Sequence, residues 1–560
     1  MVGKETEGPL SLRMANAVGL PLLASSMGLL LSSLIASPLQ AQQSTAPTPR
    51  KAGLLFQTSE RCMACHNGLS TPSGEDVSIG LDWRPSMMAN SSRDPYWQAA
   101  VRREIVDHPK ARAAIEDECA VCHMPMSRYD AKVHGRKGEV FAHLPFKPDS
   151  PDDRLAADGV SCAACHQIED EKLGTRESFV GRFVIDASRA EGERKMYGPF
   201  DVDAGRTRIM RSSTGFRPTE STHIQKSELC ATCHTLYTKA LGPEGDVIGE
   251  LPEQVPYQEW LHSDYREEKN CQSCHMPVVA DDIPITSVLG EPRAGISRHV
   301  FVGGNFFILR MLNRYRGDLG VAALPPELEE SASRTIAFLQ SQTARLEIDR
   351  IERRPGGLEV EVSIENLGGH KLPTAYPSRR VWLHVVVRDG NNRVVFESGA
   401  LEAQGVIQGN DNDADSSRYE PHYTRIQTRD QVQIYESIMV NQRGVPTTGL
   451  LSAVRFVKDN RLLPRGFDKF TAHQDIAVQG NAVQDPDFRG GGDRVLYLIS
   501  LGDAEGRLQI EAELWYQPIS YRWASNLRQY KAMETERFIT YFDSMSSASA
   551  VTLARASAEI

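Results

Sequence analysis

The 560-residue chain lacks three features that would place it in common classes of protein. It has no excess of basic residues, and its formal net charge of −10 argues against a nucleic-acid-binding surface. It has no long apolar run beyond the N-terminus, so no later segment is expected to span a membrane. It also has no cysteine outside one repeated motif, which leaves no cysteines for a separate disulfide framework.

No Ser-His-Asp set or pair of carboxylates stands out, so the sequence does not predict hydrolytic or general acid–base catalysis. The length favours two to four domains, and an apolar content of 40% is typical of an ordered, soluble protein. The acidic balance favours partners that carry basic docking patches.

The N-terminus has the pattern of a targeting segment. Arg13 precedes a mostly apolar run from about residue 15 to 36, and a small, polar, proline-bearing stretch follows it. This pattern predicts a signal peptide over residues 1–41, although Leu39 stands where a small residue is preferred. The alternative is an uncleaved membrane anchor. Both interpretations place residues 42–560 outside the cytoplasm, in the periplasm or an equivalent compartment.

All ten cysteines lie in five copies of the pattern Cys-x-x-Cys-His. This pattern is the attachment signature of haem c, in which both thiols bind the porphyrin and the histidine reaches the iron. Disulfides, structural zinc and a thioredoxin-like site also use paired cysteines, but none of them requires a histidine after every pair. The sequence therefore predicts five covalent haems, bound through Cys62, Cys65, Cys119, Cys122, Cys162, Cys165, Cys230, Cys233, Cys271 and Cys274, with proximal ligands His66, His123, His166, His234 and His275.

The motifs are spaced irregularly, at intervals of 57, 43, 68 and 41 residues, which excludes a solenoid of equal repeats. We expect residues 42–340 to form one haem-packed domain of short helices and irregular segments, because the macrocycles themselves supply much of the apolar core.

A second axial ligand makes an iron an electron carrier, whereas a vacant position allows it to bind a substrate. His299 follows the last motif beside two glycines and an apolar helix pattern, and His223 precedes Cys230 by seven residues. His134 and His143 lie between the second and third motifs. We predict these four histidines as distal ligands.

From residue 341 the pattern changes to alternating polar and apolar residues rich in β-branched side chains, with turn signals between the segments. This predicts an antiparallel β-sandwich over residues 341–518, followed by a helical tail over 519–560. The segment GGHKLPTAYPSRRVW lies in a loop of the sandwich, about a hundred residues beyond the last cysteine. We predict that its histidine, His370, is a distal ligand supplied by the second domain, and that Arg379 and Arg380 pair with haem propionates.

The five motifs, the phrases DGVSCAACHQI and CQSCHMP, the RHVFVGGN segment and GGHKLPTAYPSRRVWLHV resemble those of exported bacterial multihaem c-type cytochromes with a C-terminal β-domain. The resemblance covers most of residues 50–540 and implies bis-histidine haems that work in respiratory electron transfer. Multihaem nitrite reductases carry a lysine in place of one proximal histidine. All five motifs here end in histidine, which argues against that activity.

The leading hypothesis is an electron carrier with five mostly six-coordinate haems, whose partners are a redox donor and a redox acceptor. One alternative is an oxidoreductase in which one open haem acts on a small nitrogen or sulfur oxyanion, attracted by Lys371, Arg379 and Arg380. A second alternative is a structural subunit whose β-domain docks a membrane complex or another copy of the chain. The sequence implies no particular small-molecule substrate.

Overall fold

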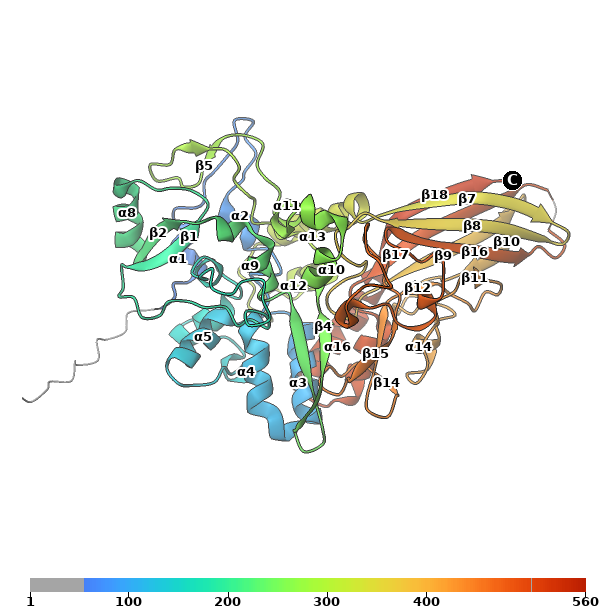
Figure 1. The fold of residues 1–560 in the computed structure, drawn as a ribbon, viewed down its shortest axis with the longest axis horizontal. Helices are drawn as coiled ribbons and strands as arrows, with labels where there is room; N and C mark the ends of the chain where they lie inside the picture. Colours follow the sequence, from blue (N-terminus) through green and yellow to red (C-terminus); the bar gives the residue numbers. More distant parts are fainter. Residues whose placement is uncertain (1–54, 505) are drawn as a thin grey trace, which may run out of the picture. The chain divides into compact units, whose positions relative to one another are not determined.

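Short helices dominate the first part of the structure, a computed structural model that describes residues 55–504 and 506–560 (Figure 1). The predicted signal peptide, residues 1–41, lies outside the described residues. Between the helices lie three small two-stranded sheets, β1–β2 (Arg194–Gly198, Phe216–Glu220), β3–β4 (Leu236–Leu241, Val247–Gln254) and β5–β6 (Ile283–Pro284, Pro292–Arg293). The helices are α1 (Ser59–Met63), α2 (Ile79–Trp83), α3 (Pro95–Asp107), α4 (Arg112–His123), α5 (Pro125–Val133), α6 (Pro151–Ala157), α7 (Cys162–Cys165), α8 (Ala204–Thr214), α9 (Ser227–Ala231), α10 (Pro256–Leu261), α11 (Cys271–His275), α12 (Phe306–Arg314) and α13 (Pro325–Gln342).

Strands predominate after residue 343. One sheet has the order β10-β9-β17-β18 (Val394–Ser398, Arg380–Asp389, Leu508–Gln517, Val551–Glu559), and β12 (Ile434–Tyr435) also pairs with β9. The second has the order β11-β16-β8-β7 (Arg425–Ile426, Gly492–Ser500, Gly357–Asn366, Ala344–Arg354). A third, smaller sheet has the order β14-β13-β15 (Pro446–Thr447, Ser437–Val440, Arg455–Asp459).

The period-two pattern explains the packing of the two larger sheets. In β8, Leu358, Val360 and Val362 alternate with polar residues and are at most 1% exposed. The ring centroids of Phe396 on β10 and Tyr497 on β16 lie 6.1 Å apart, so side chains of the two sheets meet in a shared core.

The helix α12 is strongly apolar, and six of its nine residues are buried. Phe306 contacts Tyr516 of β17, and Phe307 contacts Phe542 of α16 (Met533–Met545), with ring centroids 6.4 and 5.8 Å apart. The part of the chain that carries the five motifs, residues 55–342, and the strand-rich part from residue 344 onward therefore share one hydrophobic core.

The tail differs from the helical prediction. Helices α15 (Tyr521–Asn526) and α16 are present, but the last strand, β18, pairs with β17 in an antiparallel register. Its sequence, VTLARASAE, is rich in alanine, which favours helix, but its alternating pattern suits the free edge of β17. Within residues 55–504 and 506–560, no helix has both the length and the apolar character needed to cross a membrane.

Candidate haem-binding cavity

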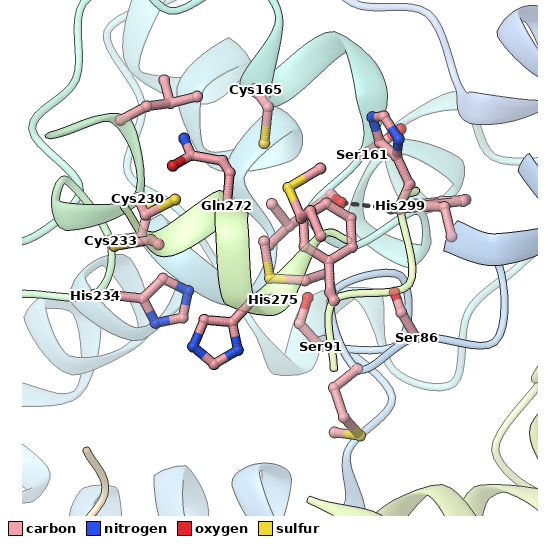
Figure 2. A pocket seen from close by; sticks show the side chains of 18 of the residues that line it. Ser86, Ser91, Ser161, Cys165, Cys230, Cys233, His234, Gln272, His275 and His299 are labelled. Carbon is pink, nitrogen blue, oxygen red and sulfur yellow. Dashed lines mark hydrogen bonds between the residues drawn. The ribbon is translucent and has the colours of Figure 1, made fainter. Parts of the chain in front are cut away.

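All five motifs border one cavity of about 910 Å³. Figure 2 shows part of its lining, with Cys165, Cys230, Cys233, His234, His275 and His299 labelled. The cavity is lined by the ten motif cysteines and the five motif histidines, together with His299 and His370. No disulfide joins these cysteines in the part of the chain that the structure describes. Motifs that lie far apart in the sequence are thus gathered around one largely apolar space, which is the arrangement that several covalent macrocycles require.

Each motif forms a helical turn that presents its cysteines and its histidine on one face. The His66 amide donates a hydrogen bond to the Cys62 carbonyl at 3.0 Å, and the His166 amide does the same to Cys162. Helical residues three and four positions apart lie on the same face, so both thiols and the imidazole point into the cavity.

The imidazole rings are held in the tautomer that an iron requires. In four of the motifs the histidine Nδ1 lies within hydrogen-bonding distance of a backbone carbonyl, which can only accept. Nδ1 therefore carries the proton, and the Nε2 lone pair is left free for a metal. The pairs are His66 with Ile285 (2.6 Å), His123 with Ser91 (2.9 Å), His166 with Tyr197 (2.5 Å) and His275 with Val302 (2.6 Å).

Burial favours the neutral form of the His123, His275 and His299 rings, which is the form that binds metals. It lowers the pKa of His123 and of His275 to about 4, and that of His299 to about 3. Neighbouring histidines lower the pKa values further, because two positive rings would repel each other.

Two predicted distal ligands face motif histidines across the cavity. The ring centroids of His166 and His299 lie 6.2 Å apart, with planes 19° from parallel. His275 and His370 are also 6.2 Å apart, with planes 8° from parallel. When two imidazoles bind one metal from opposite sides, with each nitrogen about 2 Å from the metal, their ring centroids are about 6 Å apart. Both pairs fit an iron between them.

Three other predicted ligands are not brought to the cavity. His223 is buried, but its Nδ1 bonds the Ser221 hydroxyl at 2.7 Å and its Nε2 donates to the Ile168 carbonyl at 2.8 Å. His143 lies between Asp153 and Ser127. His134 is exposed and bonds the Asp130 carbonyl. These placements differ from the prediction. A histidine that is close to a motif in the sequence can still have its ring nitrogens bonded to other groups, away from the cavity.

Of the three basic residues predicted to attract an anion, Lys371, Arg379 and Arg380, only Arg379 borders the cavity. Arg379 is half-buried, lines the cavity, and donates a hydrogen bond to the Thr374 carbonyl. Arg380 instead makes a buried bidentate pair with Asp413, and Lys371 pairs with Asp459 at 2.7 Å. The prediction that Arg380 binds a propionate is therefore wrong, and Lys371 offers no surface charge to an anion.

Trp97, which borders the site, was not predicted from the sequence. The Trp97 ring stacks on the His123 ring with centroids 4.3 Å apart and planes 6° from parallel. Trp97 lies on α3, and His123 is the last residue of α4. The sequence does place Trp97 on the inner face of an amphipathic helix. A tryptophan in such a position is more often an ordinary core residue, so this pattern alone does not predict a role at the site.

Comparison with known proteins gives one structural match. No family model matches the chain, and no curated protein matches it. A solved structure, a penta-heme cytochrome c552 from Thermochromatium tepidum, is similar over 90% of this chain and 100% of that chain, with a TM-score of 0.52. The chain has the fold of a multihaem cytochrome. At 15% sequence identity the similarity shows the fold alone.

Proposed function

We propose that the protein is an electron carrier that holds five haem c groups in this cavity, each through two thioether bonds and one motif histidine. The supporting observation is that all ten thiols and all five imidazoles line one cavity. When bound, haem supplies a one-electron ferric/ferrous couple. We infer that the chain works outside the cytoplasm with a redox protein as donor and another as acceptor.

Contacts between motifs indicate their order. The Cys62 and Cys162 thiols lie within hydrogen-bonding reach of each other, and so do Cys230 and Cys271. The same holds for the thiols of Cys122 and Cys233, which join the second and fourth motifs. Cys165 of the third motif is also close enough to affect both cysteines of the fourth. We infer a branched order in which the fourth motif adjoins the second, third and fifth, and the first adjoins the third.

We propose His166 with His299, and His275 with His370, as axial pairs. Among the described residues, no second histidine is paired in this way with His66, His123 or His234. The thioethers of Met87 and Met88 line the same cavity and offer the other common axial ligand of c-type cytochromes.

One observation favours an alternative in which one haem is open and acts on a small oxyanion. Arg379 lies close enough to His234 that its positive charge lowers the pKa of that ring, after the larger effect of burial. No carboxylate among the described residues pairs with Arg379. A planar guanidinium suits an oxyanion as well as it suits a propionate.

The EPR spectrum of the oxidised holoprotein, quantified against five irons per chain, separates the two functions. The electron carrier is expected to show low-spin signals for nearly all its iron, including two with bis-histidine character. A high-spin signal from about one iron in five that changes with nitrite or sulfite would instead support the oxidoreductase.

A further inference from the structure

Two buried glutamates line the haem cavity and take no part in haem attachment. Glu253 on β4 and Glu104 on α3 are each 4% exposed. The Glu253 carboxylate accepts hydrogen bonds from the Thr238 hydroxyl and from the Gln254 amide, the latter at 3.0 Å. Among the described residues, no lysine or arginine forms an ion pair with it. A buried carboxylate without a cation is costly, so such a group requires an explanation.

Glu104 adds a second carboxyl group to the same region. Its carboxylate accepts the amides of Leu450 at 2.8 Å and Leu451 at 3.3 Å. The neighbouring Arg103 favours the ionised form of Glu104, but burial outweighs it and raises the carboxyl pKa. For Glu253, burial raises the pKa to about 7, and the charge of Glu104 contributes in the same direction.

The two carboxyls lie beside the second motif. Burial raises the pKa of the Cys119 thiol on α4, and the charges of both glutamates raise it further, which places them near this attachment point. Tyr96 of α3 and Tyr376 of the 370–379 loop complete the surroundings and hydrogen-bond each other. Their ring centroids are 5.9 Å apart. Within the described residues, the groups that interact with Glu253 include Thr238, Gln254, Glu104 and Tyr376, which are neutral or acidic, while Arg103 lies beside Glu104.

We propose that Glu253, with Glu104 beside it, binds a proton when an electron enters the haem held by the second motif. A one-electron donor reduces ferric iron to ferrous, and one proton from solvent forms an O–H bond on the Glu253 carboxylate. Reoxidation releases both. The added electron makes the buried region more negative and so raises the proton affinity of the carboxyl. Linkage requires the converse, that the bound proton raises the potential of the haem.

This inference rests on the proposed function, since it requires haem at the second motif. The test is a spectroelectrochemical titration of the holoprotein between about pH 5 and 9. One haem potential is expected to fall as pH rises, by up to about 59 mV for each tenfold change in proton activity. The potential falls because deprotonation of Glu253 at higher pH leaves a negative carboxylate, which disfavours the addition of an electron to the haem.

Matched variants assign the effect to one carboxyl. Glu253→Gln should abolish the slope, and Glu253→Asp should keep it with a shifted midpoint. Glu104→Gln should displace the slope toward lower pH, because Glu253 loses its like-charged neighbour. Glu250→Gln is the control: Glu250 lies on the same strand and pairs with Arg176 at the surface, so its loss should change nothing.

Infrared difference spectra give a second readout. A protonated-carboxyl band should appear on reduction and be missing in Glu253→Gln. A pH-independent set of potentials, or a slope that persists in Glu253→Gln, would overturn the inference while leaving the haem-carrier function intact. Absence of covalent haem from the wild-type protein would instead overturn the proposed function.

Discussion

A chain that carries no haem is expected not to keep this fold. Without haem, the largely apolar cavity of about 910 Å³ would have to fill with water or collapse. Contact between apolar lining and water costs about 25 cal/mol per Å², and native domains are usually stable by only about 5–15 kcal/mol. The helices α7 and α11 consist of little but motif residues, so they should lose their order first.

This expectation is checked with a chain in which all ten motif cysteines are alanine, compared with the holoprotein by circular dichroism and urea unfolding. The variant should show no cooperative transition in the segment 55–340. A milder variant, Cys162→Ala with Cys165→Ala, removes one attachment site and should lower the unfolding midpoint strongly. Cooperative unfolding of the cysteine-free chain near the holoprotein midpoint would show that haem does not supply the core.

Replacing His370 with alanine is expected to convert one iron in five from low-spin to high-spin. The His370 ring lies opposite His275, and its Nδ1 lies 3.0 Å from the Lys371 carbonyl, which directs Nε2 toward the cavity. The fold should survive, because the substitution removes a side chain from the cavity wall and not from the hydrophobic core. EPR and the near-infrared charge-transfer bands of the oxidised protein measure the change.

A buried ion cluster holds the His370 loop against the haem-binding segment. One Glu259 oxygen accepts the Lys371 amide at 3.1 Å and the Thr374 hydroxyl at 2.6 Å, while Arg461 contacts the other at 3.0 Å. Glu259 is fully buried on α10, just before the fifth motif. Breaking such a cluster at one member costs about 3–5 kcal/mol. Glu259 is thus a positioning residue for His370.

Glu259→Gln is therefore expected to destabilise the protein and to give a partial, temperature-dependent high-spin signal from the same iron. His262→Ala serves as the control, because His262 caps the C-terminal end of the same helix and its ring bonds the Asp468 carbonyl, away from the cavity lining. The pairing of His275 with His370 would be contradicted by a His370→Ala spectrum that contains no additional high-spin iron.

The local features of this protein could be predicted from its sequence. The motif spacing fixes where the thiols and imidazoles lie on each helical turn, and the alternation in segments such as residues 358–364 fixes the inward faces of the strands. Both are local consequences of backbone geometry. The edge strand β18 differs from the helical prediction, because it forms its backbone pairing with β17, a strand that lies well before it in the sequence.

The second axial ligands could be predicted only in part, because they depend on contacts that are distant in sequence. His299 and His370 stand beside paired glycines, and both lie opposite motif histidines in the structure. His223 has an equally favourable place in the sequence, seven residues before Cys230. Its ring is nonetheless occupied by Ser221 and by Ile168, a residue 55 positions away. No local pattern reports such a contact.

The mass of the exported, purified chain under denaturing conditions tests the haem-carrier proposal most directly. Covalent haem survives denaturation, whereas metal ions and loosely bound cofactors are lost. We expect the mass of the mature polypeptide plus five haem groups, with no free thiol left to react with an alkylating agent. A chain of unmodified mass, or one whose ten cysteines form disulfides or bind zinc, would contradict the proposal.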